Sequence, residues 1–580
     1  MVAWAIKNMG GMIPRVSARQ LPDNMAEQAV NCDLSSGALD TIPVPKLKID
    51  LATPARRAYR FPNANNTDEV WLPLPSEFSS VVRSPLANDQ HRRIYWTNPG
   101  NQAPWWNTYE RMDAGDPHYN LGIVQPTGAP GVIASGGSAT PLVSRAYVYT
   151  YFNAYGEESA PSLPSDVTTG NPDGSWVVSG WPTSAPANPV GFNYPPVVGV
   201  RIYRTVTGLQ TGAQFFHVIE WEFPSVPVNV DDGTLDSEVV NNLLLASAGW
   251  GNPVSGLDGL TAMPGGMLIG FSRNSVYFCE PNRPHAWPPA YDQSVHYDVS
   301  WLGVWDQSLV VLTAGFPSIG SGTSPNNFAF RQVRVNEPIV SRGSALVDAT
   351  GVYYASQNGL VVFNNGGIKN QTIAQVTSKQ WINEYNAKTI VACRHDAQYL
   401  AIDGNFANGF IFDYSEARLG VVRLTPFNAV VCVWSDEHSG ETYAITSDGK
   451  VYLWDSPDVA LAPLVFRWRS KQFYAPAPVS LGACQISLDP SVANDLPETL
   501  PVLYNNDPTM NLPEGVNAVF KLYAGPDGAH LVTTRSLTKG REIFRLPGGF
   551  KAFDWQCEVV SRVKIHSIEL ATSMKELSGA

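Results

Sequence analysis

The stretch Glu441–Asp455, ETYAITSDGKVYLWD, places two runs of alternating apolar residues on either side of Asp448-Gly449. An Asp-Gly pair supplies the positive φ angles that a tight two-residue turn requires, so this stretch predicts a β-hairpin. Gly351–Gly366, GVYYASQNGLVVFNNG, repeats the plan around Asn358-Gly359. Looser versions occur at residues 57–74, 91–106, 265–281 and 398–416. The chain is therefore expected to be mainly β.

The hairpins between Gly265 and Asp455 start about 40 to 50 residues apart, which is the period of four-stranded propeller blades. A propeller leaves only short sheet edges, which suits a chain with so many hairpins. We therefore expect a β-propeller, with an array of β-sandwiches as the alternative.

A different pattern interrupts the propeller at residues 138–248. About six or seven short strands surround a central run, Arg201–Thr205, without the Cys…Trp…Cys spacing of an immunoglobulin domain. This predicts a fibronectin-III-like or Ig-like β-sandwich inserted into the propeller. The propeller is then divided into a first part at 51–137 and a remainder at 249–460.

The two ends of the chain form further expected units. Residues 1–50 are predicted to be an N-terminal segment with a short helix at Leu21–Asn31, where Pro22 suits a first turn and apolar residues follow at helical spacing. Residues 461–580 alternate like the strands of a C-terminal β domain. Two more helices are expected at Ile373–Asn386 and at residues 237–248, so helices are few.

The composition favours a folded protein that does not grip nucleic acid. Hydrophobic residues make up 44% and charged residues 16%, and 39 Lys and Arg against 51 Asp and Glu give a formal charge of −12. That sign is wrong for a protein that neutralises phosphates. The start of the chain lacks the apolar core of a signal peptide, and no stretch is apolar enough for a membrane anchor. We expect assembly in the cytoplasm.

The six cysteines lie far apart, without CxxC or close Cys/His pairs. This spacing indicates neither a zinc site nor a disulfide framework, so free thiols are expected. We predict no cofactor and no metal site.

Residues 276–288, VYFCEPNRPHAWP, gather Cys279, Glu280 and His285 within seven residues. A nucleophilic cysteine needs a nearby base and a group that lowers its pKa. Here the cysteine ends a β run, a position typical of a small buried apolar residue, and three prolines stiffen the nine residues after it. A rigid structural loop is the favoured interpretation.

Two pairs of carboxylates, Asp231-Asp232 and Asp292 with Asp298, could form a glycosidase pair or a calcium site. Neither fits an EF-hand loop, and Asp-Asp-Gly is the composition of a turn. No phosphate-binding loop, HExxH or GxSxG motif occurs. We therefore expect a protein that is not an enzyme, without catalytic residues.

Basic residues cluster at Arg56-Arg57, at Arg92-Arg93, and at Arg467, Arg469 and Lys471 in FRWRSK. Alternating cations on a strand face could touch phosphates or meet an acidic partner. A solvated face or an ion pair between subunits is the favoured interpretation.

Several segments in order along the chain carry a family resemblance. Residues 9–45 contain a Gly-Gly pair, a Leu-Pro-x-x-x-Ala segment and a Ser-Gly-x-Leu turn, and residues 256–291 contain MLIGFSRNSVYFCEPNRPHAWP. Residues 308–325, 347–363, 468–473 and 544–577 continue the likeness. In these segments the chain resembles the podovirus tail nozzle family, the tail tubular protein B-like tail hub proteins of short-tailed bacteriophages. The usual serine-like residue before the Glu of the YFxEP segment is Cys279 here.

The resemblance implies a structural virion protein of the tail, a subunit of a hexameric nozzle that extends the portal–adaptor channel and conducts double-stranded DNA during ejection. The implied partners are further copies of itself in a homo-hexamer ring, the adaptor and portal proteins, and tail fibres or a tail needle. DNA would pass without sequence-specific binding, and residues 1–50 would contact the ring or adaptor. Residues expected at the interfaces between chains are Trp105, Trp106, Arg283, His285, Trp287, Arg467 and Arg469.

Two other functions stay open from the residues alone. One is a propeller that binds or cleaves glycans, and the other is a baseplate or fibre-attachment hub.

Overall fold

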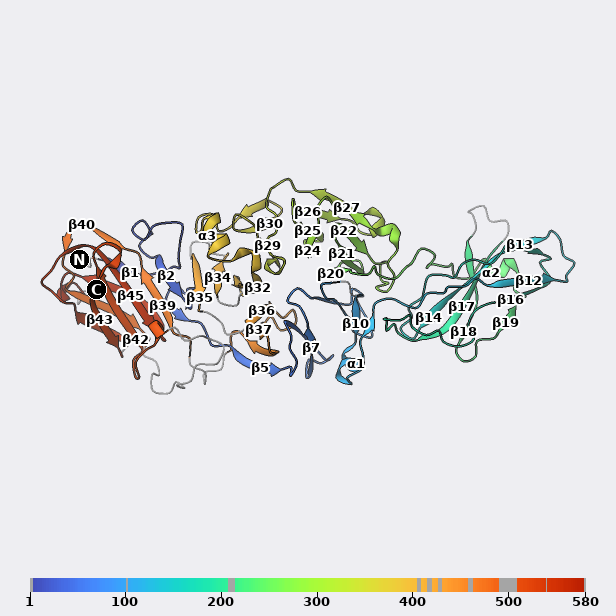
Figure 1. The fold of residues 1–580 in the computed structure, drawn as a ribbon, viewed down its shortest axis with the longest axis horizontal. Helices are drawn as coiled ribbons and strands as arrows, with labels where there is room; N and C mark the ends of the chain where they lie inside the picture. The colour runs from blue at the N-terminus through green and yellow to red at the C-terminus, as the bar shows by residue number, and fades with distance from the viewer. Residues whose placement is uncertain are drawn as a thin grey trace.

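The computed structural model describes residues 4–100, 103–206, 214–403, 408–414, 420–425, 430–456, 463–489, 508–538 and 540–577. These residues form an elongated, mainly β molecule with three parts in a row (Figure 1). A propeller lies in the middle, the inserted sandwich lies at one end, and a domain that contains both chain ends lies at the other. The expected mainly β fold is confirmed.

The propeller consists, in the described residues, of seven consecutive blades. Five of them are four-stranded sheets, one has two strands, and the four strands of the remaining blade continue through a parallel pairing with residues 26–30 into a ten-stranded sheet of the domain at the chain ends. The two-stranded sheet is β6 (Arg57–Pro62) and β7 (Glu69–Leu74). The other six blades begin with the strands β8 (Ser80–Arg83), β20 (Asp258–Met263), β24 (Val299–Trp305), β28 (Leu346–Asp348), β32 (Val391–His395) and β36 (Val430–Ser435). These first strands lie beside one another from blade to blade and line a central cavity of about 680 Å³. From β20 onward they start at the spacing that the sequence predicted.

The outer strands complete each blade by antiparallel hairpins. They are β9 (Ile94–Thr97), β10 (Trp105–Asn107), β11 (Tyr119–Asn120), β21 (Met267–Ser272), β22 (Ser275–Phe278), β23 (Gln293–Ser294), β25 (Ser308–Thr313), β26 (Ser318–Ser321), β27 (Ala329–Gln332), β29 (Gly351–Ala355), β30 (Leu360–Asn364), β31 (Gly367–Asn370), β33 (Gln398–Ile402), β34 (Gly409–Asp413), β35 (Val421–Leu424), β37 (Thr442–Thr446) and β38 (Lys450–Leu453). The hairpins predicted at Asp448-Gly449 and Asn358-Gly359 join β37 to β38 and β29 to β30. The turn predicted between β33 and β34 lies outside the described residues.

The last blade takes its fourth strand from the sequence that precedes the first blade. β5 (Lys46–Asp50) pairs antiparallel with β38, with Asp50 opposite Lys450. A strand from before the first blade thus becomes the outer strand of the last blade, which ties the ring closed.

The domain at the chain ends contains strands from both the beginning and the end of the sequence. β1 (Trp4–Ile6) pairs with β46 (Ile565–Ala571), and β2 (Ala26–Val30) pairs with β39 (Phe466–Ser470). The other elements are β3 (Cys32–Asp33), β4 (Asp40–Thr41), β40 (Phe473–Val479), β41 (Ala483–Leu488), β42 (Ala518–Ala524), β43 (His530–Leu537), β44 (Arg541–Arg545), β45 (Ala552–Ser561) and α4 (Met574–Leu577). The described parts of residues 4–41 and 463–577 therefore form one unit, which we call the terminal domain, instead of an N-terminal segment and a separate C-terminal domain.

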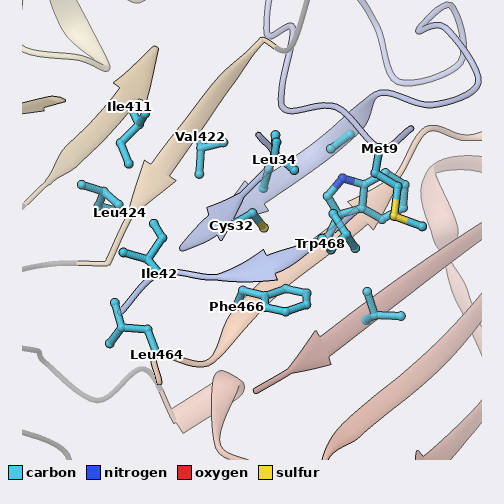
Figure 2. Packing of buried hydrophobic residues seen from close by; sticks show 14 of the residues in the cluster. Met9, Cys32, Leu34, Ile42, Ile411, Val422, Leu424, Leu464, Phe466 and Trp468 are labelled. Carbon is cyan, nitrogen blue, oxygen red and sulfur yellow. The ribbon is translucent and has the colours of Figure 1, made fainter. Parts of the chain in front are cut away.

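The core of the terminal domain continues into the propeller. Figure 2 shows Cys32 and Leu34 from the N-terminal part packed between Val422 of β35 and Phe466 and Trp468 of β39. The indole Nε1 of Trp468 donates to the carbonyl oxygen of Gly10 at 2.9 Å. These contacts bind the first and last parts of the sequence to the propeller.

The prediction of a helix at Leu21–Asn31 is wrong, because this segment contains the strand β2. Its pairing with β39 shifts register between Ala26 and Gln28. A β-bulge there places Ala26 and Ala29 on the buried side, three residues apart, and so imitates helical spacing.

The helix expected at Ile373–Asn386 is confirmed as α3 (Ser378–Asn383), whose first turn is capped by the Thr377 side chain. Within residues 237–248 only the end of α2 (Asp236–Val239) is helical.

The inserted sandwich consists of three small sheets. Its strands are β12 (Gly131–Ser135), β13 (Val143–Arg145), β14 (Tyr147–Asn153), β15 (Thr168–Gly170), β16 (Ser175–Ser179), β17 (Val197–Thr205), β18 (Phe215–Glu222) and β19 (Asn229–Asp231). Because β12 pairs with β16, the insert begins before Gly131, earlier than the predicted residue 138. The predicted central run, Arg201–Thr205, lies in β17 between β14 and β18.

A serine-rich segment covers the free edge of β14. Ser159, Ser162 and Ser165 donate their backbone N–H groups to the carbonyl oxygens of Tyr151, Tyr149 and Tyr147 at 2.8 to 2.9 Å. The hydroxyl oxygens of the same serines accept the N–H groups of the same tyrosines at 2.9 to 3.1 Å. The prolines between the serines keep this segment extended, so the edge is closed to pairing with another chain.

Candidate functional site: the junction of propeller and insert

The chain crosses between the propeller and the insert twice, and the two crossings are joined by Asn252. Its side-chain nitrogen donates to the carbonyl oxygen of Ile123 at 3.0 Å, and its side-chain oxygen accepts the N–H of Ile123 at 3.1 Å. The Asn252 side chain thus makes the two hydrogen bonds with the backbone of Ile123 that a neighbouring strand would make. This pairing restricts rotation of the insert about its two connections.

The loop that follows β22, residues 279–288, lies at this junction. It folds on itself, because the Glu280 N–H donates to the carbonyl oxygen of Ala286 at 2.8 Å. His285 is 2% exposed, and its Nε2 atom lies 3.1 Å from the carbonyl oxygen of Glu158 in the insert. The loop therefore holds the insert against the propeller.

A buried ion network crosses the same junction. Arg93, which precedes β9, contacts Asp89 at 2.8 Å and Glu157 of the insert at 2.9 Å. The Nδ1 atom of His285 lies 3.9 Å from the Glu157 carboxylate. Burial raises the pKa of Glu157, while the nearby Arg93 works in the opposite direction. Burial also lowers the pKa of His285 to about 3, so this imidazole is neutral at ordinary pH.

A cavity of about 510 Å³ opens beside the network. Arg93, Glu157, Arg283 and His285 contribute to its walls, together with residues 86–88 of the propeller. The charged groups of Arg93 and Glu157 are already paired with each other. The arrangement is suited to fixing two domains rather than to moving a proton or attacking a bond.

Aromatic residues form the core behind the loop. Trp106 and Trp287 are buried in one cluster with Cys279, and the Trp287 indole donates to the carbonyl oxygen of Pro284 at 2.8 Å. The Cys279 sulfur accepts the N–H of Leu268 at 3.0 Å, and burial raises the pKa of its thiol to about 12. A thiol with a raised pKa is a poor nucleophile, which agrees with the interpretation of this loop as structural.

The structure brings four of the seven residues expected at chain interfaces into this region and its core: Trp106, Arg283, His285 and Trp287. Three of them, Trp106, His285 and Trp287, are buried within the chain and contact its own domains. They present little surface to a second chain, so their placement differs from the expectation. Arg283 is exposed and Trp105 is partly exposed. For these two, contact with another chain stays a prediction.

Arg467 and Arg469 lie on β39, far along the sequence from the loop, and their side chains alternate with buried Phe466 and Trp468 as the sequence predicted. The Nε atom of Arg469 donates to the Gln556 side chain at 2.8 Å, and its guanidinium lies over the Tyr523 ring at 4.8 Å. Both arginines are half-buried and engaged within the terminal domain. Their role between chains also stays a prediction.

The candidate carboxylates have structural contacts. Asp231 accepts the N–H of Trp176 at 2.7 Å, and Asp232 is buried against Arg204 at 2.8 Å and the Tyr147 hydroxyl at 2.8 Å. Asp292 and Asp298 are exposed. No group of three or more potential metal ligands occurs in the described part of the chain.

Sequence reasoning missed Glu157 and Asn252. Glu157 lies in the turn YGEES, where an acidic residue is expected to be solvated, and Asn252 lies in a Gly/Pro-containing linker. Only the tertiary structure brings them to Arg93 and Ile123. The pair Arg92-Arg93 is visible in the sequence as a basic cluster, yet nothing there distinguishes Arg93 as its buried member.

The described helices include none that is long and apolar enough to cross a membrane.

No protein-family model matches the chain, and a search of curated proteins finds no match. Solved structures with a partial likeness include the Neurospora crassa Pan2 WD40 domain, at 9% identity and a TM-score of 0.27, covering 50% of this chain and 86% of that one. BamB from Moraxella catarrhalis is similar at 12% identity and a TM-score of 0.24, covering 65% of this chain and 97% of that one. Because these TM-scores are low, the description of the propeller depends on the strand pairing observed in this chain and not on the likeness.

Proposed function

We propose that the chain is a non-enzymatic subunit of a hexameric tail nozzle of a short-tailed bacteriophage, which extends the portal–adaptor channel and conducts double-stranded DNA during ejection. In this proposal it is assembled in the host cytoplasm and resides in the virion tail. Its partners are its own copies, the adaptor and portal proteins, and tail fibres or a tail needle.

The observation that carries the proposal is the structural role of residues 256–291, the most recognisable segment of the resemblance. Residues 256–291 form three strands of a blade and the loop that fixes the insert to the propeller. The Tyr291 hydroxyl donates to the Glu280 carboxylate at 2.7 Å, His285 contacts Glu158 of the insert, and Cys279 is buried with a raised pKa. A segment devoted to packing domains supports a mechanical role better than a catalytic one.

Charge gives the proposal a second support. The insert, residues 138–248, contains three arginines, no lysine and ten acidic residues. Two of those arginines, Arg145 and Arg204, are completely buried. Acidic surfaces repel phosphate, so DNA that passes them would slide and not stick.

The test is assembly. The purified chain, alone or mixed with an adaptor–portal complex, is expected to form six-fold rings with an axial hole wide enough for duplex DNA in cryo-electron micrographs. A chain that stays monomeric under all these conditions and is absent from purified tails contradicts the proposal.

A further inference from the structure

The central cavity of the propeller has the size of a site for a small molecule. Its volume of about 680 Å³ lies within the range of about 300 to 1,000 Å³ that is typical of ligand pockets. It is lined mainly by the first strands of the blades, which we call the inner strands. The nozzle proposal gives this cavity no role, because DNA would pass along the axis of a ring of chains and not through the middle of one propeller.

Much of the cavity wall is apolar. Leu260 of β20, Leu302 of β24 and Val391 of β32 line the cavity, and each is at most 6% exposed. Cys393 on β32 and Cys432 on β36 line it as well, and both are buried free thiols. An apolar molecule in the cavity would therefore contact the inner strands of several blades at once.

One cation of the wall has no carboxylate partner. Arg57, the first residue of β6, lines the cavity, and its Nη1 atom donates to the carbonyl oxygen of Ser79 at 2.9 Å. Among the described residues it forms no ion pair. Burial raises the pKa of the Cys393 and Cys432 thiols, and the charge of Arg57 opposes this rise. The guanidinium therefore lies near the apolar wall.

Most of the other charged side chains of the wall belong to ion pairs. These pairs are Arg342–Asp258, Arg394–Asp348, Arg56–Glu77 and Arg60–Asp436. Asp396 and Glu437, which also line the cavity, are exposed and follow the ends of β32 and β36.

The free cation and these two carboxylates lie at opposite ends of the cavity. The inner strands run in the same direction, since Arg57 contacts Ser79 where β6 and β8 begin, and Arg60 contacts Asp436 at 3.1 Å where β36 ends. A negative group is therefore favoured at the end that contains Arg57 and disfavoured at the other.

We propose that the central cavity binds an organic anion with an apolar body, of the class of medium-chain carboxylates, with its negative group at Arg57. A guanidinium can donate two parallel hydrogen bonds to a carboxylate, and burial of the apolar body against the inner strands supplies further affinity. Because the bound molecule would touch several blades, it should stabilise the closed propeller. This inference does not depend on the nozzle proposal, since the cavity lies within one chain.

The experiment uses the full chain and three probes in isothermal titration calorimetry: octanoate, octylammonium and acetate. The first two share an apolar body and differ in charge, whereas acetate has the negative charge without the body. Octanoate is expected to bind about tenfold or more tightly than either of the others. Arg57→Gln should weaken octanoate binding about tenfold. Arg331→Gln, at an exposed arginine of β27 outside the cavity, is the matched control and should bind octanoate like the wild type.

A second measurement locates the bound molecule. Octanoate should slow alkylation of Cys393 and Cys432 by iodoacetamide more than it slows alkylation of Cys484 and Cys557, which lie in the terminal domain. Mass spectrometry of the alkylated peptides gives the four rates. This comparison needs no variant, so it decides the matter even where Arg57→Gln does not fold.

Three results overturn the anion site. They are equal binding of octanoate and octylammonium, undiminished octanoate binding by folded Arg57→Gln, and protection of Cys393 and Cys432 that is no greater than that of the two cysteines in the terminal domain. Ring assembly enters none of these measurements. The anion site and the nozzle proposal can therefore fail separately.

Discussion

Arg93 and Glu157 form a buried ion pair of 2.9 Å although they are 64 residues apart in the sequence and belong to different domains. Arg93 comes from the propeller and Glu157 from the insert. The side chains of both are at most 5% exposed, so the orientation of the insert depends on a contact that is largely shielded from water.

Removing the cation from this pair should loosen the junction. Arg93→Leu leaves the Glu157 carboxylate buried without its main counter-charge, at an expected cost of about 3 to 5 kcal/mol in the free energy of opening. Glu157→Gln, which keeps the shape and a hydrogen-bond acceptor, should cost less. Hydrogen exchange of the Glu158 amide, which donates to the Nε2 atom of His285 across the junction at 3.3 Å, measures the opening. Equal exchange in wild type and Arg93→Leu would contradict this account.

Acid should destabilise the junction through His285. Its folded pKa, lowered to about 3, lies below the ordinary value of 6.5, so only the unfolded or opened form binds a proton between these values. The stabilisation is complete above pH 6.5 and is lost as the pH falls toward 3. Between pH 7.5 and pH 5 the loss is about 2 kcal/mol.

Urea denaturation at several pH values tests this dependence. His285→Gln should flatten the profile below pH 6.5, whereas His530→Asn, at an exposed residue of β43, should keep it. A wild-type profile that stays level from pH 7.5 to pH 5 excludes a neutral buried His285.

Within the loop after β22, Trp287 should matter far more than Cys279. Trp287→Ala opens a cavity in the cluster that it shares with Trp106, and such truncations cost about 3 to 5 kcal/mol. In Cys279→Ser the hydroxyl can accept the Leu268 N–H in place of the sulfur, so the loss should be small. Thermal unfolding and ring assembly of both variants provide the comparison. Similar tolerance at the two positions would show that the loop does not hold the domains together.

The closure of the propeller should depend on Gly449. Its φ of +89° favours glycine, and a Cβ atom there would collide with the carbonyl oxygen of Thr53, beside β5. Gly440 has a φ of +73°, but no atom lies within 4 Å of the position that its Cβ would take, which makes Gly440→Ala the matched control. The control should cost about 1 kcal/mol from backbone strain alone, and Gly449→Ala distinctly more. Protease cleavage near β5, accelerated only in Gly449→Ala, would be the expected sign.

Local sequence patterns predicted the blades well because a hairpin with Asp-Gly or Asn-Gly needs no distant partner. They failed where tertiary pairing decides. At Ala26 and Ala29 a bulge imitated helical spacing, and the strand became visible only beside β39. Likewise Trp106, His285 and Trp287 were expected at a surface between chains, since aromatic and Pro-rich loops suit interfaces. The sequence could not show that the chain buries these side chains itself, with His285 against Glu158 and Trp106 against Tyr155 of the insert, and Trp287 in the cluster behind the loop.

The pairing of β1 with β46 and of β2 with β39 also sets an order of events during synthesis. The ribosome releases β1 and β2 first, yet their partners emerge only after the propeller and the insert have been made. The terminal domain therefore forms last. A chain interrupted before residue 466 cannot complete it, and so lacks the sheet and the core contacts that bind the start of the sequence to the propeller.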